Sequence, residues 1–368
     1  MSPIELILLA VAGFTTLILL YYYLLIFSKI NRKSIPTSGD FPAVSIVIAA
    51  RNEKTNLENK LPLILEQDYS NFEVVVINDG SYDGTSDLLK DFKLRYPHLK
   101  VVDLNLDERY RKGKKFAITM GIKAASFDQL LFTDADCVPA SNQWIKQMMQ
   151  AKGDKPIVLG FAPLKHKIGL LGAISYYETF HTALQYLSYA IKGKTYMAVG
   201  RNMSYTKKLF FDNKGFATHQ HLLSGDDDLF IQEVATKNNV SICLEQDSFM
   251  ISDAPRKWSK YIKQKGRHLS TSEFYKTKYK RMLGMYSIAH IVLYVSLAIC
   301  LLYEATYIYA ASILAFKWIV QWIVFFKPAM KLRSKFVAFF LPFYDICYTL
   351  YLLLFSLLKP FIGTKKWK

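Results

Sequence analysis

Residues 130–136 read Leu-Leu-Phe-Thr-Asp-Ala-Asp, an apolar run that ends in two acids. Side chains two apart in a strand point to the same side, so Asp134 and Asp136 are expected to converge on one place. Two converging carboxylates repel each other unless a positive charge lies between them. A hard divalent cation with oxygen ligands meets that need, and such a cation also binds phosphate oxygens. The stretch therefore predicts a strand that delivers a metal and nucleotide-diphosphate site.

Apolar runs alternate with helical patterns on both sides of this stretch, from about Pro42 to Asp253. The expected strands are Val44–Ala49, Val74–Ile77, Val101–Leu104 and Leu130–Thr133, and the expected helices between them are Thr55–Leu65, Thr85–Leu94 and Lys115–Ala125. This alternation indicates an α/β fold whose sheet is largely parallel at the start. Ligands in such sheets bind beyond the carboxyl ends of the strands, so residues 49–53, 78–84 and 134–136 are expected to meet.

The second of these strand ends, residues 77–85, contains two glycines and several short polar side chains. Such residues are typical of a tight turn that leads into a helix N-cap. Asp79 in this turn is also suited to accept hydrogen bonds from the edge of a nucleotide base. Lys114 presents a similar choice, because it either contacts phosphate or is a solvated lysine at a helix start. The local sequence leaves both alternatives open.

The first thirty residues have the pattern of a membrane anchor. Leu6–Phe27 contains no charged side chain and is long enough to cross a bilayer. Basic residues follow this run and only Glu5 precedes it, which is the reverse of a cleaved signal peptide. By the positive-inside rule we expect residues 1–30 to be an uncleaved anchor, with the N-terminus outside and the following domain in the cytosol.

Residues 284–358 contain further apolar segments. Met285–Phe326 is divided near Glu304 into two spans of about twenty residues each, which suits two crossings. The last segment, Phe336–Leu358, is broken by Pro342 and Asp345. The basic loop before it and the basic tail 359–368 are both expected in the cytosol, which conflicts with a single crossing. The segment therefore either breaks the rule or lies in the interface and returns, and its proline and aspartate favour the second option.

The chain of 368 residues carries a net charge of +17. Residues 256–283 hold ten Lys or Arg and one acid, Glu273, and this composition suits the anionic inner face of a membrane. Because the basic clusters adjoin apolar spans, we expect no nucleic-acid partner. The four cysteines show no Cys-x-x-Cys spacing, so neither a disulfide framework nor a zinc site is expected.

Seven motifs, in this order and spacing, resemble the family 2 glycosyltransferases. They are Val44–Glu53, Asn78–Thr85, Lys112–Lys114, Thr133–Asp136, Gly200–Asn202, Ser224–Leu229 and Gln264–His268. The resemblance implies a GT-A (Rossmann-like) α/β domain with a mostly parallel mixed sheet over residues 40–255, flanked by N-terminal and C-terminal transmembrane helices. A Gln-x-x-Arg motif then falls in the basic segment 256–283.

The resemblance also implies roles for individual residues. On the donor side, Glu53 and Asp79 would line the nucleoside pocket, Lys114 would approach phosphate, and Asp134 and Asp136 would hold Mg²⁺ or Mn²⁺ on the diphosphate. Gln264 and Arg267 would lie near the diphosphate and acceptor, with Asn202 and His268 on the acceptor side. Inverting transfer further needs a carboxylate that takes the proton of the acceptor hydroxyl. Aligning on the following leucine makes Asp226 this base, aligning on the acidic pair makes it Asp227, and we favour Asp226.

Two features bear on the acceptor. The processive synthases carry Gln-x-x-Arg-Trp, but this chain has His268 in place of the tryptophan that forms a platform for an acceptor sugar. Ile168–Ile191 reads as an amphipathic helix that either packs in the core or forms a ledge for a lipid acceptor. His181, His219 and His221 are candidate metal ligands, although packed or surface histidines are commoner.

Together these observations predict an inverting glycosyltransferase of the inner membrane with a cytosolic catalytic domain. It would move a hexose or N-acetylhexosamine from a nucleotide diphosphate sugar, with a UDP-sugar as the expected donor, to a lipid or lipid-linked glycan. The enzymatic alternative is a processive polysaccharide synthase of the cellulose, hyaluronan or poly-N-acetylglucosamine type. The remaining alternative is a non-catalytic, donor-binding membrane scaffold.

Overall fold

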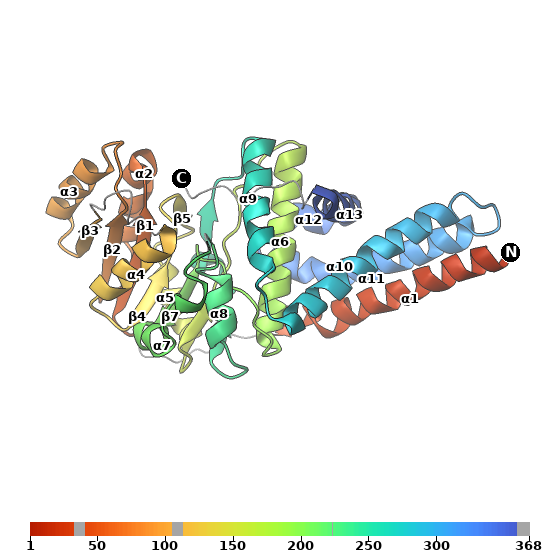
Figure 1. The fold of residues 1–368 in the computed structure, drawn as a ribbon, viewed down its shortest axis with the longest axis horizontal. Helices are drawn as coiled ribbons and strands as arrows, with labels where there is room; N and C mark the ends of the chain where they lie inside the picture. Colours follow the sequence, from red (N-terminus) through yellow and green to blue (C-terminus); the bar gives the residue numbers. More distant parts are fainter. Residues whose placement is uncertain (33–40, 105–112, 223, 359–368) are drawn as a thin grey trace.

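A computed structural model describes residues 1–32, 41–104, 113–222 and 224–358. It places an α/β domain at one end of an elongated molecule and three long helices at the other (Figure 1). Lys33, Lys112 and the basic tail 359–368 lie outside the described residues.

The α/β domain is built on a sheet with strand order β3-β2-β1-β4-β7-β6-β8. The strands are β1 (Val44–Ala50), β2 (Phe72–Asn78), β3 (Leu99–Asp103), β4 (Gln129–Phe132), β6 (Ile157–Leu159), β7 (Met203–Thr206) and β8 (Val240–Ile242). β1 pairs in parallel with β2 and β4, and β2 with β3, whereas β7 is antiparallel to both β4 and β6. The expected α/β fold with a mostly parallel mixed sheet is thereby confirmed.

Both faces of this sheet are buried, which is why its central strands are continuously apolar. Val47 packs with helix α4 (Lys114–Ala124) in one core, and Ile46 packs in the other core with three helices. Those helices are α2 (Lys54–Leu65), α3 (Thr85–Arg95) and α5 (Trp144–Lys152). Helix α4 lies close to the sheet because Gly121 has no side chain, since a Cβ there would lie 2.4 Å from Ile77 Cδ1.

Shorter elements complete the domain. They are β5 (Cys137–Pro139), α7 (Lys207–Asp212), η3 (Ala217–His219), α8 (Asp228–Val234), η4 (Gln246–Ser248) and β9 (Met250–Ser252). β5 pairs antiparallel with β9 and forms a second, two-stranded sheet.

Helices α6 (Leu170–Ile191) and α9 (Trp258–Ser272) lie side by side between the sheet and the long helices (Figure 1). Lys265 Nζ of α9 donates to Glu178 Oε2 of α6 at 2.5 Å and ties the pair together. The expected helix at 168–191 is confirmed as α6. His181 on α6 is fully buried and hydrogen-bonded to the Tyr286 hydroxyl at 2.9 Å, so it serves in packing.

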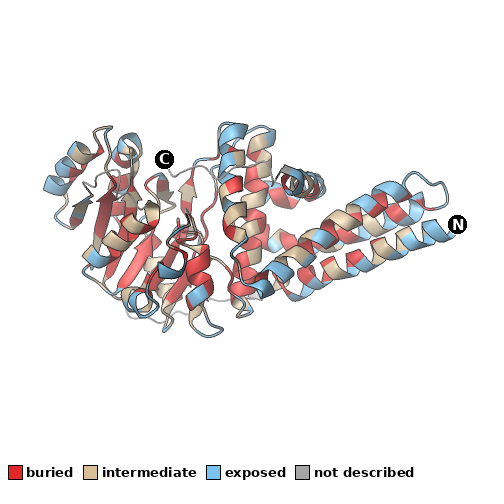
Figure 2. Ribbon diagram, in the orientation of Figure 1, coloured by how far each residue is buried: buried red, intermediate tan, exposed pale blue. Residues whose placement is uncertain are grey.

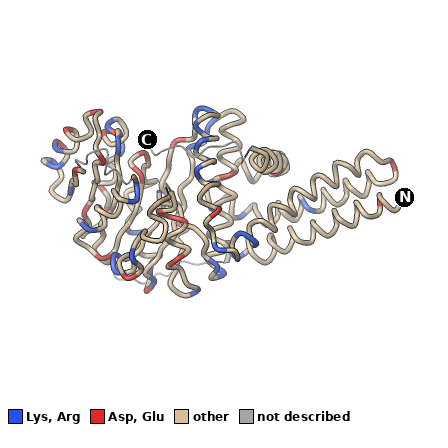
Figure 3. The backbone as a smooth tube through the Cα atoms, viewed as in Figure 1, with Lys and Arg blue, Asp and Glu red and all other residues tan. Residues whose placement is uncertain are grey.

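Among the residues that the structure describes, three helices are long and apolar enough to cross a membrane: α1 (Pro3–Leu25) with the adjoining η1 (Phe27–Arg32), α10 (Thr277–Cys300) and α11 (Tyr307–Lys331). They run together as a bundle whose outer surface carries exposed apolar side chains such as Phe14, Leu17 and Ile323 (Figure 2). Most lysines, arginines and acids lie elsewhere, on the α/β domain and near the base of the bundle (Figure 3). This distribution supports membrane association.

The last apolar segment forms α12 (Lys335–Phe339) and α13 (Leu341–Leu358). Figure 1 shows α13 nearly end-on, whereas α1, α10 and α11 lie lengthwise in the same view. Helix α13 therefore runs across the bundle rather than along it. The placement of Phe336–Leu358 in the membrane interface stays a prediction.

Candidate active site

A cavity of about 240 Å³ opens at the carboxyl ends of β1 and β4. Three charged side chains from separate elements line it: Lys114 at the start of α4, Asp134 just after β4, and Asp226 in the loop before α8. Val47, Phe132 and other apolar residues form its floor. A sheet of this topology is expected to bind its ligand at this edge.

Lys114 bridges the two carboxylates. Its Nζ lies 2.9 Å from Asp134 Oδ1 and 3.3 Å from Asp226 Oδ2. Burial lowers the pKa of Lys114, but the two nearby aspartates outweigh burial and raise it, so the ammonium stays charged. Burial raises the pKa of Asp134, yet Lys114 together with Arg201 and Arg267 lowers it below its usual value. Lys114 is therefore part of the site and not a solvated lysine.

The three consecutive aspartates have different partners. Asp227 caps α8, because its Oδ1 accepts the Asp228 N–H at 2.8 Å while its Oδ2 accepts the Gly200 N–H at 2.9 Å. Asp228 Oδ2 accepts the Tyr275 hydroxyl at 2.7 Å. Only Asp226 of the three lines the cavity. The arrangement favours Asp226 over Asp227 as a base that meets an acceptor hydroxyl.

Burial also keeps two of these acids partly protonated near neutral pH. It raises the pKa of Asp227 to about 6, with the charge of Asp226 adding to the effect. It raises the pKa of Asp228 to about 7, with the charge of Asp227 adding to the effect. The acidic loop therefore directs the carboxylate of Asp226 toward Lys114, while Asp227 and Asp228 are held by hydrogen bonds.

The ends of β1 and β2 are joined into one rim beside the cavity. Asn52, in a left-handed conformation at φ 55°, accepts the Tyr82 N–H through its Oδ1 at 3.0 Å, and its own N–H donates to Ser81 Oγ at 2.9 Å. Glu53 follows in this rim at the N-cap of α2. Asp79 is buried at the end of β2. The two residues expected at the nucleoside thus lie on adjoining loops.

Asp136 does not follow the strand alternation. β4 ends at Phe132 and a turn spans residues 135–136, so the strand argument for convergence is wrong at this position. Asp134 lines the cavity, whereas Asp136 is exposed. At this turn Lys60 Nζ donates to the Asp136 carbonyl at 2.7 Å, and β5 begins at the next residue.

The His, Cys, Asp and Glu side chains near the cavity decide which kind of metal site is possible. Among the described residues, no three His, Cys, Asp or Glu side chains lie close enough together to hold an ion by themselves, and this includes His181, His219 and His221. Mg²⁺ in nucleotide sites, however, usually takes only one or two carboxylates and fills its other positions with substrate phosphates and water. Asp134 lines the cavity and suits such a shared site, whereas Asp136 is exposed on the adjoining turn.

Asn202 is not directed toward the cavity. It is fully buried, its Nδ2 donates to the carbonyls of Phe161 and Ser248, both at 2.8 Å, and its Oδ1 accepts Trp144 Nε1–H at 3.0 Å. Because these bonds occupy both ends of the amide, Asn202 joins neighbouring loops in this conformation and does not face an acceptor.

The Gln-x-x-Arg motif lies on α9. Gln264 and His268 are exposed, one turn apart, and Arg267 is half-buried. Arg267 is close enough to Asp134 for its charge to lower the pKa of that carboxyl. A hydrogen bond between the hydroxyls of Thr271 and Ser224 fastens α9 to the acidic loop.

Arg201 is a site residue that the sequence reasoning missed. Its guanidinium donates to Ser252 Oγ of β9, and its charge helps to lower the pKa of Asp134. Its place inside the Gly200–Asn202 motif was the sequence signal that could have identified it. A basic residue in such a motif is suited to face an anionic ligand. Together with Lys114 and Arg267 it makes the cavity cationic around its acids.

Comparison with known proteins agrees with this geometry. The family model for glycosyl transferase family 2 matches residues 45–211. A poly-beta-1,6-N-acetyl-D-glucosamine synthase of Staphylococcus epidermidis is 29% identical over 163 residues, which is 43% of this chain and 38% of the synthase. The synthase of Staphylococcus aureus is 28% identical over 152 residues, 41% of this chain and 36% of that protein. The match therefore spans less than two-fifths of these relatives.

A solved structure shares the fold over nearly the whole chain. A mannosyltransferase from Pyrobaculum calidifontis in complex with GDP-Man and Mn²⁺ superimposes with a TM-score of 0.58 at 18% identity. The superposition covers 94% of this chain and 99% of that one, so it includes helices outside the sheet domain as well. The family model thus identifies residues 45–211 as a glycosyl transferase family 2 domain, and the superposition shows that the chain shares the fold of this mannosyltransferase.

Proposed function

We propose that the protein is an inverting glycosyltransferase that uses a nucleotide diphosphate sugar and a membrane-embedded acceptor. The observation that carries the proposal is the Lys114 bridge between Asp134 and Asp226 in one cavity. It brings a phosphate-side acid and a base-side acid to one cavity, where both could act on the same sugar carbon.

In the proposed reaction Asp226 accepts the proton of the acceptor hydroxyl. The new bond joins that oxygen to the anomeric carbon, while the bond from this carbon to the diphosphate oxygen breaks. Lys114, Arg201 and Arg267 place positive charge where the leaving diphosphate develops negative charge. Asp134 and Asp136 would hold a Mg²⁺ or Mn²⁺, which would neutralise more of that charge.

For the donor, we propose that Asp79 and Glu53 contact the nucleoside, and we expect the nucleotide to be UDP. The rim formed by the ends of β1 and β2 supports this assignment, because it continues directly from the cavity that would hold the diphosphate. Both hexosyl and N-acetylhexosaminyl transfer belong in the proposal.

For the acceptor, we propose a lipid or lipid-linked glycan at the cytosolic leaflet of the inner membrane. Helix α9 carries Gln264, Arg267 and His268 on the side of the domain that meets the long apolar helices (Figure 1). Tethering at both ends concentrates the site on a surface where a lipid-phase acceptor gains most.

Polymer synthesis is the second candidate, because the matched relatives are poly-beta-1,6-N-acetyl-D-glucosamine synthases. Two features favour the addition of one or a few sugars instead. His268 stands where the processive pattern has tryptophan, and the described residues contain three candidate membrane spans, which is little material for a glycan channel.

The test is transfer by the full chain in membranes supplied with labelled UDP-glucose, UDP-N-acetylglucosamine and GDP-mannose. The expected product is a discrete species that partitions into organic solvent and depends on Mg²⁺ or Mn²⁺. Asp154→Asn is the matched control, since this side chain is 84% exposed on the domain surface. A water-soluble ladder of long glycan would favour the synthase over this proposal. The absence of product with all three donors would contradict it.

A further inference from the structure

Among the described residues, three lysine side chains are almost completely buried, those of Lys115, Lys265 and Lys317. Taking a cation out of water is unfavourable unless a carboxylate or several hydrogen-bond acceptors replace the water. Lys265 of α9 meets this need through Glu178 of α6, at 2.5 Å. Lys115 differs, because in the part of the chain that the structure describes its ammonium is bound by backbone carbonyls and not by a carboxylate.

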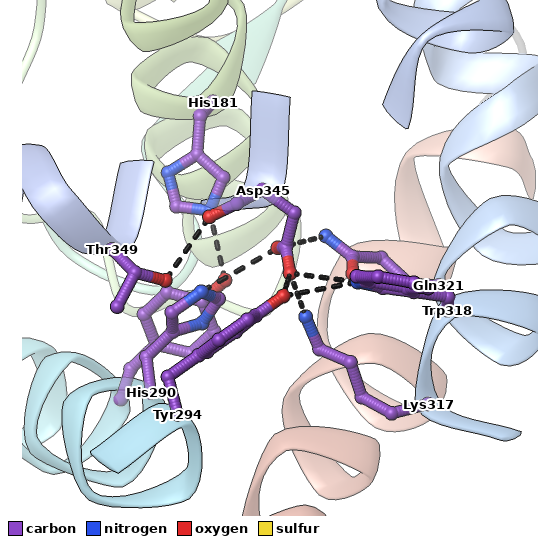
Figure 4. A network of polar contacts seen from close by, with 9 residues as sticks. His181, His290, Tyr294, Lys317, Trp318, Gln321, Asp345 and Thr349 are labelled. Atoms are coloured by element: carbon purple, nitrogen blue, oxygen red, sulfur yellow. Dashed lines mark hydrogen bonds and ion pairs between the residues drawn. The ribbon is translucent and has the colours of Figure 1, made fainter. Parts of the chain in front are cut away.

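Lys317 shows what a buried lysine does when its task is structural (Figure 4). It pairs with Asp345 of α13, and neither side chain is exposed. This carboxylate accepts hydrogen bonds from side chains on two further helices, which are Lys317, Trp318 and Gln321 of α11 and Tyr294 of α10. A charge in an apolar region is stable only with its partners, so the cluster sets where α13 lies.

Lys115 is instead directed at a loop of the α/β domain. It is the second residue of α4, and its side chain is 2% exposed. Its Nζ donates to the carbonyl of His219 at 2.5 Å and to the carbonyl of Leu222 at 3.2 Å. The Leu222 N–H also donates to the His219 carbonyl, at 3.1 Å, so both acceptors belong to one tight turn. The ammonium therefore ties this turn to the start of α4.

The turn precedes the acidic loop in the chain. Asp226 comes shortly after Leu222, and its Oδ2 lies 3.3 Å from Lys114 Nζ. Lys114 and Lys115 are consecutive on α4, so their side chains leave the helix about 100° apart. Lys114 lines the cavity, whereas Lys115 is not among the residues that line it. The first turn of α4 thus holds Asp226 by its side chain and the preceding turn by its backbone.

Other contacts fasten the same stretch of chain. His219 Nδ1 lies 3.4 Å from Glu233 Oε1 of α8, and the hydroxyl of Ser224 shares a hydrogen bond with that of Thr271 on α9. Lys115 adds a link to α4. Three helices therefore meet at the stretch that leads to the acidic loop, and α4 is the one that also supplies a charged side chain to the cavity.

Lys115 keeps its charge although burial opposes it. Burial lowers the pKa of Lys115 to about 8, while the negative charges of Asp226 and Asp228 act in the opposite direction. The side chain therefore stays largely protonated at pH 7. An apolar side chain of similar length would fill the same space without the cost of burying a charge. The ammonium adds hydrogen bonds to the turn and an attraction to the acidic loop.

We propose that Lys115 is a positioning residue for the base, because it fixes the turn at His219 and Leu222 and thereby the place at which the Asp226 carboxylate meets the acceptor hydroxyl. The proposal rests on the proposed function, in which Asp226 takes the proton of that hydroxyl. Lys115 does not line the cavity, so it acts through Asp226. Precise support matters here, since a displacement of about 1 Å in a reacting group can cost about 100-fold in rate.

The first test is a double-mutant cycle on sugar transfer by the full chain in membranes. Lys115→Met removes the donors and the charge at nearly constant length, so kcat should fall about 10- to 100-fold while the KM for the donor stays within about twofold. In the Asp226→Asn background the same substitution should lower the remaining rate by less than about twofold, because the base through which Lys115 acts is already absent. Lys115→Gln, which keeps two N–H donors, provides the same cycle if Lys115→Met does not fold.

Lys123→Met is the matched control, because this lysine lies on the same helix with its side chain exposed. It should transfer sugar at the parent rate. An unchanged kcat in Lys115→Met would overturn the proposal. An equal loss with and without the Asp226 carboxylate would also overturn it, since additive effects would assign Lys115 to the general stability of the domain.

Hydrogen–deuterium exchange in nanodiscs gives a readout that needs no enzyme assay. In Lys115→Met the amides of residues 216–222 should exchange about tenfold faster, while those of β1 and β4 stay as protected as in the parent. Faster exchange at 216–222 together with no transfer by the parent would contradict the proposed function but not the hold of Lys115 on the turn. Transfer by the parent together with unchanged exchange would contradict the role of Lys115 and leave the proposed function in place.

Discussion

The protein contains two lysine–carboxylate clusters that differ in how they are enclosed. At the active site Lys114 faces two carboxylates, Asp134 and Asp226, and the side chains of Lys114 and Asp134 are 23% and 32% exposed. In the membrane bundle Lys317 faces a single carboxylate, Asp345, and neither side chain is exposed at all. The first cluster opens onto a cavity and the second is closed by its neighbours.

This contrast distinguishes a reactive cluster from a structural one. The carboxylates around Lys114 line a cavity, so their oxygens are accessible to a cation or to an acceptor hydroxyl. At the second cluster the single carboxylate pairs with one lysine. Tyrosine, tryptophan and glutamine side chains complete its hydrogen bonds, so its oxygens are not available to another cation or hydroxyl. Substitutions should therefore affect chemistry at the first cluster and folding at the second.

The largest expected effect is on turnover. Asp226→Asn removes the base but keeps the side-chain shape, so transfer should fall by about two to four orders of magnitude. Donor binding should persist, and Asp154→Asn should match the parent chain. The rates are measured as labelled sugar moved into the lipid extract. If Asp227→Asn is the more damaging variant and Asp226→Asn is mild, the base is Asp227.

The next effect is on stability, at the closed cluster. Lys317→Met leaves the Asp345 carboxylate buried without its cation, which should cost about 3–5 kcal/mol. The double variant Lys317→Met with Asp345→Leu removes both charges and should recover most of that loss. Thermal unfolding in nanodiscs compares the two variants. A single variant as stable as the parent would show that this pair does not hold α13.

A smaller effect is expected in metal dependence. Asp136→Asn removes one of the two carboxylates expected at the diphosphate, so the Mn²⁺ concentration for half-maximal transfer should rise about 10- to 100-fold, by analogy with losses at metal-site residues. Asp103→Asn is a suitable control at the end of the edge strand β3, where the carboxylate accepts from Asn78 Nδ2. An unchanged Mn²⁺ titration for Asp136→Asn would leave Asp134 as the sole protein ligand.

These two clusters also show what could be predicted from the sequence. The strands and helices of the α/β domain were predictable because each is a local apolar or periodic run, and Asp134 followed from the end of such a run. The alternation expected for Asp134 and Asp136 was wrong because the strand stops at Phe132 and the chain turns before Asp136.

Contacts between distant elements were not predictable. Lys114 and Asp226 are 112 positions apart, so no local pattern brings them together, and the environment of Arg201 depends on β9 in the same way. Asp345 was noticed as an interruption of an apolar segment, but Lys317 lies on another helix and only the folded bundle pairs them. Asn202 shows the converse, because a motif residue proves to be occupied entirely by structural bonds.

The smallest expected effect concerns the pH dependence of stability at the acidic loop. Burial, followed by the charge of Asp227, raises the pKa of Asp228 to about 7 from an ordinary value of 3.8. The folded state thus holds this proton more tightly than the unfolded state does. The associated stability is present below about pH 4 and is lost as the pH rises toward 7.

Asp228→Asn has no proton to lose at this position and its amide can still accept the Tyr275 hydroxyl. Its melting temperature should therefore fall less than that of the parent between pH 4 and pH 7, by roughly 2–4 °C for each kcal/mol of linkage removed. Tyr275→Phe tests the same contact from the other side. It removes the hydrogen bond that favours the ionised acid, so it should steepen the fall. Parallel pH profiles for the parent and Asp228→Asn would show that Asp228 ionises freely in the folded protein. Burial would then not raise the pKa of this carboxyl, contrary to the prediction.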